Sequence, residues 1–158
     1  VLHPAAAFAT KQWAAENFAS VANQLHARFP VIVVTTPAEI SLVEEIKTVC
    51  SGVHALTDLP LPQVTALLAR ARLFVGNDSG IAHMAAAVAT PSVVVFGSSN
   101  RAHWSPWSTA PAEIVFEEMD CQPCHGYFCE KFETPECIKR VPLERVMAAV
   151  ERVLAARL

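Results

Sequence analysis

The stretch from Leu73 to Ser99, LFVGNDSGIAHMAAAVATPSVVVFGSS, places the strongest constraint on how this chain can fold. Its first three residues form a short apolar run typical of a buried parallel strand, and Ser92 to Phe96 form a second such run. Between them, Ile81 to Val88 is small and apolar enough for a helix that packs closely on a sheet. The stretch therefore predicts strand, tight turn, helix and strand, with its polar residues gathered where the first strand gives way to the helix.

The turn from Gly76 to Gly80 lies where open α/β sheets bind ligands, outside the carboxyl end of a strand. A helix that starts there presents free N–H groups and the positive end of its dipole, which favour an anion such as phosphate. The candidate binding residues at this point are Asp78, Ser79, Gly80 and His83. The pattern by itself also allows Asp78 or Ser79 to be a simple helix cap and His83 an ordinary residue of the first turn.

Strands and helices alternate along the rest of the chain. The apolar patterns predict strands at 1–2, 31–35, 53–56, 73–75, 92–96 and 114–116, and helices at 11–29, 38–49, 60–70, 81–88 and 142–156. A Cys-rich excursion at 119–138 precedes the terminal helix. This alternation predicts an α/β fold with a doubly wound, Rossmann-like parallel sheet, and we expect residues 1–158 to form a single domain.

Composition narrows the function classes. Hydrophobic residues make up 53% of the chain and charged residues 17%, so we expect a substantial core rather than disorder. The formal net charge of −3 gives no reason to expect a nucleic-acid partner, and no apolar run approaches the ~20 residues of a membrane span. The chain begins within a strand at Val1, with no signal-peptide pattern, as an excised domain would.

The central stretch resembles the nucleotide-sugar-binding motif of glycosyltransferase family 9, the lipopolysaccharide heptosyltransferases. That motif reads Asp-Ser/Thr-Gly, two residues, His, an Ala-rich helix, then Pro and a strand ending in Phe-Gly. The matching residues here are Asp78-Ser79-Gly80, His83, Ala85-Ala86-Ala87, Pro91 and Phe96-Gly97. The resemblance covers nearly the whole chain and implies the nucleotide-sugar-binding, C-terminal half of a two-domain GT-B glycosyltransferase.

The resemblance also implies binding roles for residues outside this stretch. Lys11 and Trp13 match a Lys-x-Trp motif after the first strand, where Lys11 would contribute positive charge to a diphosphate. Ala5 to Ala7 stands where Gly, Ser or Thr is usual, which removes hydroxyl contacts and keeps backbone N–H contacts. Glu39 matches a glutamate that binds the nucleotide ribose, and Leu59 lies where an apolar residue contacts the base. Without the resemblance, the sequence favours a solvated lysine at Lys11. A helix-start residue remains an alternative for Glu39.

In the central turn, the resemblance implies that backbone N–H groups of Asp78, Ser79 and Gly80 face the diphosphate. A buried carboxylate would repel phosphate, so Asp78 is assigned to the turn and to sugar hydroxyls. His83 would donate one hydrogen bond to phosphate or sugar and is not assigned as a general base. The family's general base and acceptor site lie in the N-terminal domain, so no catalytic residue is assigned here. No Asp-x-Asp metal motif occurs, and we expect stabilisation of the diphosphate that requires no cofactor.

The implied reaction is transfer of a heptose, or a related sugar, from an ADP-sugar to a lipopolysaccharide core acceptor, with inversion at the anomeric carbon. This half alone is expected to be inactive, because the acceptor domain is absent. The resemblance further implies a cytoplasmic protein, peripheral to the cytoplasmic face of the inner membrane. Two alternatives stay open: half of a GT-B-like nucleotide-sugar epimerase, and a non-catalytic nucleotide-binding or metal-stabilised module.

Four cysteines fall within seventeen residues: Cys121, Cys124, Cys129 and Cys137. Their spacing allows a closed tetrahedral zinc site, so a structural zinc is one expectation. An iron–sulfur cluster, free thiols in a reducing cytoplasm, and disulfides formed after purification are the alternatives. Some family 9 members have a similar stretch, which favours an inherited structural role over a catalytic one.

A loop with two tryptophans follows the central unit. Trp104 and Trp107 flank Pro106, and their indole rings suit either stacking on a sugar or base or packing within the loop. The sequence leaves both interpretations open.

Overall fold

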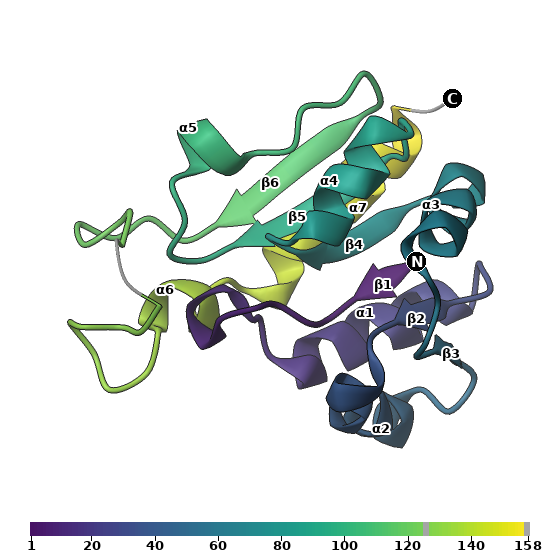
Figure 1. Cartoon of the computed structure of the whole chain (residues 1–158), viewed down its shortest axis with the longest axis horizontal. Coiled ribbons are helices and arrows are strands. Elements are labelled where there is room, and N and C mark those ends of the chain that lie inside the picture. Colours follow the sequence, from purple (N-terminus) through teal and green to yellow (C-terminus); the bar gives the residue numbers. More distant parts are fainter. Residues whose placement is uncertain (125–126, 157–158) are drawn as a thin grey trace.

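The computed structural model describes residues 1–124 and 127–156, and six of its segments form one parallel sheet (Figure 1). The strand order is β3-β2-β1-β4-β5-β6. The strands are β1 (Leu2–His3), β2 (Ile32–Val34), β3 (His54–Leu56), β4 (Phe74–Asn77), β5 (Ser92–Phe96) and β6 (Ala112–Phe116). The strand order reverses direction between β1 and β4, which confirms the predicted doubly wound α/β fold and creates a crevice at the carboxyl ends of these two strands.

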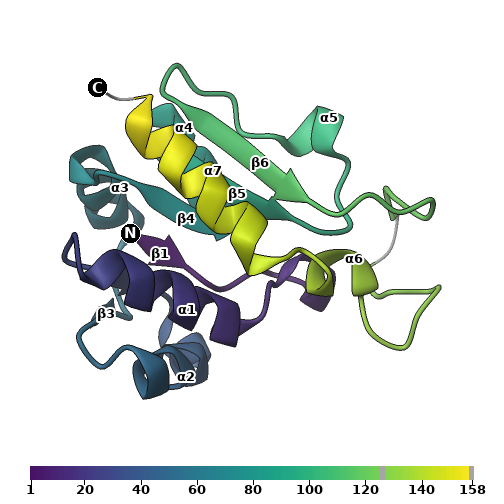
Figure 2. The same ribbon diagram turned by 180° about the vertical axis from the view of Figure 1, so that it is seen from behind.

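Helices cover both faces of the sheet. They are α1 (Ala15–His26), α2 (Ile40–Val49), α3 (Leu61–Arg70), α4 (Gly80–Ala87), α5 (Arg101–Trp104), α6 (Glu136–Lys139) and α7 (Leu143–Ala155). Helices α1, α2 and α7 lie on one face, and α3 and α4 lie on the other (Figures 1 and 2). Across residues 1–124 and 127–156, no helix combines the length and the apolar character needed to cross a bilayer.

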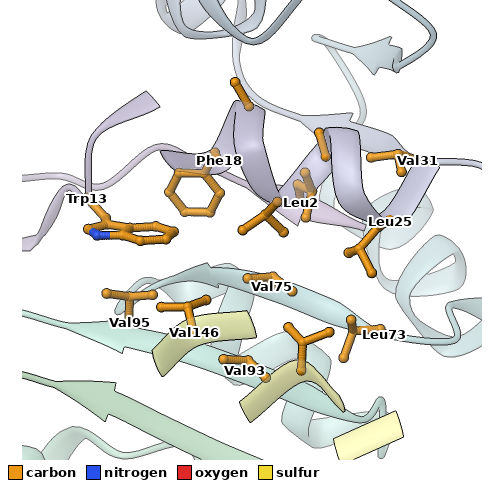
Figure 3. Close-up of a cluster of buried hydrophobic side chains, with 14 of the residues drawn as sticks. Leu2, Trp13, Phe18, Leu25, Val31, Leu73, Val75, Val93, Val95 and Val146 are labelled. Atoms are coloured by element: carbon orange, nitrogen blue, oxygen red, sulfur yellow. The ribbon is translucent and has the colours of Figure 1, made fainter. Parts of the chain in front are cut away.

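The core follows the two-residue alternation of the buried strands. In β5, Val93 and Val95 contact the cluster beneath α1 and α7, which also holds Phe18 (Figure 3). Val94 and Phe96 point the other way, into the cluster beneath α3 and α4. A strand buried on both sides needs apolar residues at every position, which is why the run SVVVF is readable from sequence.

Most predicted elements are present, and the differences in their bounds have local causes. Helix α1 begins at Ala15 rather than at Lys11, because Ala9–Lys11 forms a separate 3-10 turn and Trp13 donates its backbone N–H to the side chain of Asn77. Strand β4 continues to Asn77, two residues beyond the predicted end. The short helix α5 was not predicted; Asn100 caps it by accepting a hydrogen bond from the N–H of Ala102.

Candidate functional site

The loop between β1 and α1, residues 4–13, is tied to the end of β4 by Asn77. This side chain is fully buried; its Nδ2 donates to the carbonyl of Pro4 at 2.7 Å, and its Oδ1 accepts from the N–H of Trp13 at 3.1 Å. The indole N–H of Trp13 donates to the carbonyl of Val141 at 3.0 Å. Because the loop is held at both of its ends, Lys11 is brought to the carboxyl end of β4.

Lys11 and Asp78 form a largely buried ion pair at this edge. The distance from Lys11 Nζ to Asp78 Oδ2 is 2.9 Å, and the two side chains are 23% and 4% exposed. Ser99 Oγ donates a hydrogen bond to the same carboxylate oxygen. The carboxylate therefore balances and orients the ammonium group, a role that the sequence interpretation of Asp78 did not include.

Ser79 occupies the cap position of α4, yet its side chain does not cap the helix. Its Oγ lies 3.3 Å from Nδ1 of His3, at the end of β1. Burial lowers the pKa of His3 to about 4, although the charge of Glu39 opposes this shift, so the imidazole is neutral at pH 7. Since Ser79 leaves the first turn of α4 uncapped, the N–H groups there are suited to an anion. The N–H of Asp78 is not among them, contrary to the sequence prediction, because it donates to the carbonyl of Val95 at 3.0 Å and continues the pairing of β4 with β5.

Gly80 stands in open space at the start of α4. A Cβ added at this position would meet no heavy atom of the described residues within 4 Å, beyond its chain neighbours and its own helix backbone. Packing inside the chain therefore does not require glycine here. The opposite holds at Gly97, where a Cβ would lie 2.1 Å from the carbonyl oxygen of Thr10.

Glu39 lies across the crevice and has a structural contact of its own. Its Oε2 accepts hydrogen bonds from the N–H of Thr36 at 2.8 Å and from the hydroxyl of Thr36 at 2.9 Å, which completes a capping box at the 3-10 turn Pro37–Glu39. The helix-start interpretation of Glu39 is thus correct. Because the same residue also borders the cavity described next, it does not exclude a contact with ligand.

One cavity of about 580 Å³ brings together the six residues predicted to bind the phosphates and sugars of the donor, and we call it the first cavity. Its lining consists of Lys11, Glu39, Asp78, Ser79, Gly80 and His83, together with His3, Ala5, Ala6, Ala7, Leu61, Ile81, Met84 and Trp104. The sequence interpretation did not include His3 among the candidate binding residues. It also named Leu59 as the apolar contact, whereas Leu61 is the residue that borders the cavity. The order of β1 and β4 in the sheet explains why His3 belongs to the site.

The cysteine-rich segment gives no support to the expected zinc site. All five cysteines are free thiols; Cys121, Cys124 and Cys129 border a separate cavity, and Cys137 is buried in α6. Within residues 1–124 and 127–156, no group of three or more His, Cys, Asp and Glu side chains is placed to hold a metal ion. Burial, together with the charges of the neighbouring cysteines, raises the pKa of the Cys124 and Cys137 thiols. Residues 125–126 of the excursion lie outside the described residues.

The chain matches a known protein family over most of its length. The family description "Glycosyltransferase family 9 (heptosyltransferase)" matches residues 1–133. Lipopolysaccharide heptosyltransferase 3 of Escherichia coli is 31% identical over 160 residues, which cover 98% of this chain and 46% of that protein. The chain thus spans about half the length of the curated relatives it matches.

Solved structures share the fold. The structure of E. coli ADP-heptose LPS heptosyltransferase II matches with a TM-score of 0.83 at 22% identity, over 99% of this chain and 46% of that one. The dodecameric iron-containing heptosyltransferase TibC of enterotoxigenic E. coli, solved with ADP-D-β-D-heptose, matches with a TM-score of 0.77 at 17% identity, over 99% and 45% of the two chains. At these identities the likeness establishes the fold alone.

Proposed function

The chain belongs to glycosyltransferase family 9, and we propose that residues 1–158 are one nucleotide-sugar-binding domain, the donor-binding half of a GT-B heptosyltransferase. The donor is an ADP-sugar, with heptose or a related sugar as the transferred group, and the acceptor is the lipopolysaccharide core. The protein works in the cytoplasm, at the inner face of the inner membrane. Two structural neighbours, the E. coli ADP-heptose LPS heptosyltransferase II and TibC in complex with ADP-D-β-D-heptose, support this choice of nucleotide.

The observation that carries the proposal is the buried Lys11–Asp78 pair beside the uncapped start of α4. A diphosphate bears negative charge, and here it would meet an oriented ammonium group together with the N–H groups of Ser79 and Gly80. Charge-assisted hydrogen bonds of this kind are about twice as strong as neutral ones. Asp78 holds Lys11 in place, and Lys11 still lines the first cavity.

The remaining wall of the first cavity fits the other parts of the donor. Leu61, Ile81 and Met84 form an apolar side suited to the flat face of a nucleobase. Glu39 would accept hydrogen bonds from the ribose hydroxyls. Both hydrogen bonds of its capping box go to Oε2, so its second oxygen, Oε1, would bind the ribose. His83 would donate to a phosphate or sugar oxygen.

In the proposed reaction, the bond between the anomeric carbon and the β-phosphate oxygen breaks, and its electron pair leaves with ADP. The oxygen of an acceptor hydroxyl forms the new bond from the opposite face, and its proton passes to a general base outside this chain. Lys11 and the N–H groups of α4 stabilise the negative charge that grows on the leaving diphosphate, which requires no metal ion. This chain alone should therefore bind donor and transfer no sugar.

Calorimetric titration of the chain with ADP, UDP and ADP-heptose tests the donor site. We expect ADP and ADP-heptose to bind and UDP to bind more weakly. The variant Gly80→Ala should melt at or above the wild-type temperature, because alanine favours the helix by up to about 1 kcal/mol and meets no neighbour, yet it should bind ADP much more weakly. A stable Gly80→Ala variant with wild-type ADP affinity would place the phosphates elsewhere.

A further inference from the structure

The three residues that follow β5, residues 97–99, pack directly on the turn that carries Lys11. The N–H of Ser98 donates to the carbonyl of Thr10 at 3.1 Å. A Cβ added to the first of the three residues would collide with the same carbonyl oxygen, so glycine is required for this close approach. These backbone contacts bring the next side chain, that of Ser99, to the edge of the sheet where Lys11 lies.

Ser99 binds the carboxylate that binds Lys11. Its Oγ donates a hydrogen bond to Oδ2 of Asp78, and Nζ of Lys11 lies 2.9 Å from that same oxygen. Ser99 is 7% exposed and Asp78 is 4% exposed, so water cannot readily replace the hydroxyl if it is removed. The hydroxyl therefore fixes where Oδ2 lies, and this oxygen in turn fixes where the ammonium group lies.

The hydrogen bond from Ser99 also affects how strongly Asp78 attracts Lys11. A hydrogen bond donated to a carboxylate oxygen stabilises the negative charge on it. Because Ser99 and Lys11 share Oδ2, the hydroxyl weakens the hold of the carboxylate on the ammonium group. An ammonium group has three N–H donors, so Lys11 can keep its contact with Asp78 and still donate to a phosphate oxygen.

We propose that Ser99 is a positioning residue for the nucleotide diphosphate, acting through Asp78 on Lys11. The inference rests on the proposed function, in which the diphosphate is the leaving group. Ser99 borders a neighbouring cavity and not the first cavity, so its effect on the donor is indirect. Its hydroxyl holds Asp78 in the orientation that keeps Lys11 on the wall of the first cavity.

The first test compares the affinities of the chain for ADP and for adenosine, which lacks the phosphates. Ser99→Ala should weaken ADP binding about three- to tenfold and leave adenosine binding unchanged, because the lost hydrogen bond acts on the phosphates through Lys11. Ser99→Thr should keep ADP affinity within about twofold of wild type, since it retains the hydroxyl and its methyl group can enter the cavity that Ser99 borders. Ser98→Ala is the matched control: Ser98 is also buried, and its described hydrogen bonds use its backbone N–H and carbonyl.

Two further measurements show whether Ser99 acts through Lys11. In a chain that already carries Lys11→Ala, adding Ser99→Ala should weaken ADP binding less than about twofold, because both changes remove the same contact. In NMR spectra of chain labelled with ¹³C at the lysine ε-carbons, the Lys11 signal is identified by its loss in Lys11→Ala. This signal should shift in Ser99→Ala and keep its position in Ser98→Ala.

The outcomes separate this inference from the proposed function. Wild-type ADP affinity in Ser99→Ala, an equal loss of adenosine binding, or an undiminished effect in the Lys11→Ala chain overturns the inference. So does failure of Ser99→Thr to retain ADP binding. If the wild-type chain does not bind ADP, the proposed function fails, and the NMR measurement by itself decides whether Ser99 positions Lys11: an unmoved Lys11 signal in Ser99→Ala shows that it does not.

Discussion

Asn77 and Gln122 hold two different loops at the carboxyl edge of the sheet with the same kind of hydrogen bonds. Asn77 donates to the carbonyl of Pro4 at 2.7 Å and accepts from the N–H of Trp13 at 3.1 Å. Gln122 donates to the carbonyl of Gly97 at 2.7 Å and accepts from the N–H of Met119 at 3.1 Å. Each amide thus joins two backbone groups that no regular element would pair.

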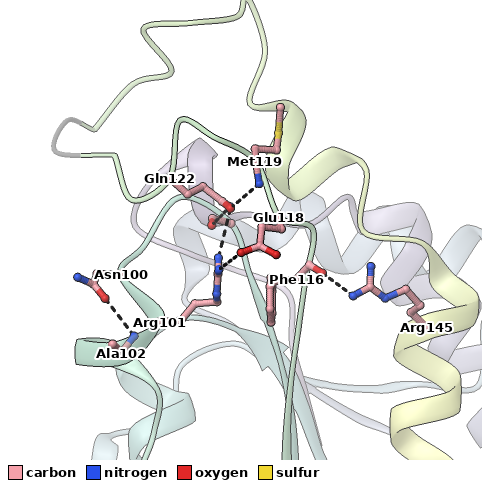
Figure 4. A network of polar contacts seen from close by, with 9 residues as sticks. Asn100, Arg101, Ala102, Phe116, Glu118, Met119, Gln122 and Arg145 are labelled. Atoms are coloured by element: carbon pink, nitrogen blue, oxygen red, sulfur yellow. Dashed lines mark hydrogen bonds and ion pairs between the residues drawn. The ribbon is translucent and has the colours of Figure 1, made fainter.

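The two amides differ in burial and in their neighbours. Asn77 is fully buried, whereas Gln122 is half-buried in the cysteine-rich segment. The Oε1 of Gln122 also accepts from Arg101 at 3.2 Å, and that guanidinium lies 3.7 Å from the ring centroid of Phe116 (Figure 4). When a buried amide is removed, water cannot reach the backbone groups that it had bonded. When a half-buried amide is removed, its former partners can form hydrogen bonds with water instead. We therefore expect equal geometry to contribute unequally to stability.

Replacing Asn77 by alanine should have the largest effect on stability. Two backbone groups, the carbonyl of Pro4 and the N–H of Trp13, would lose a buried partner, and the expected loss is about 2–4 kcal/mol in the free energy of unfolding. Urea denaturation measures this loss. A midpoint shift no larger than that of the corresponding alanine variant at Gln122 would show that burial does not separate the two amides.

The free energy of unfolding should also depend on pH, because His3 is buried close to the loop that Asn77 holds. Burial lowers the pKa of this imidazole from 6.5 to about 4, so the unfolded chain binds its proton more tightly than the folded one. Stability should therefore be fully present above pH 6.5 and should fall by about 3 kcal/mol as the pH drops to about 4. Denaturation midpoints measured across this range for wild type and for His3→Asn check the effect. The variant keeps a polar group near Ser79 and should lose most of the slope; an unchanged slope would assign it to other groups.

Lys11 lies in the loop that Asn77 holds in place, and it also lines the proposed donor site. Removing its charge-assisted contact with phosphate in Lys11→Ala should cost about 1.5–3 kcal/mol of ADP binding, or about ten- to a hundredfold in affinity. Calorimetry against ADP measures the loss, with Lys47→Ala on the exposed side of α2 as a control that makes the same change in charge. Equal ADP affinity in wild type and Lys11→Ala would remove the lysine from the site.

The sequence predicts features that depend on neighbouring residues, and it does not predict contacts between residues that lie far apart along the chain. Strand β5 was predicted at its observed bounds, because an apolar run is a local signal, and the turn at Asp78 was recognised from a local motif. Asn77 and Pro4 are 73 positions apart, and His3 meets Ser79 because β1 pairs with β4, so neither contact has a signature within its own segment. The expected zinc site shows that a local motif can also mislead. The spacing of the four cysteines is compatible with a zinc site but does not fix where the thiols lie, and the described residues hold no group of three or more metal-ligating side chains.

The smallest expected effect is that of Gln122→Ala, which completes the comparison with Asn77. Its partners at Gly97 and Met119 lie at a half-buried surface, so water can replace the lost amide, and we expect a loss of about 0.5–1 kcal/mol, within the usual net value of one hydrogen bond. Chemical denaturation of the two alanine variants under identical conditions provides the measurement. ADP affinity should stay at the wild-type level, because Gln122 does not border the first cavity.

A loss as large as that of Asn77→Ala would mean that the cysteine-rich segment is as firmly coupled to the sheet as the loop that carries Lys11. In that case the hydrogen-bond geometry, and not burial, would decide how strongly each loop is held.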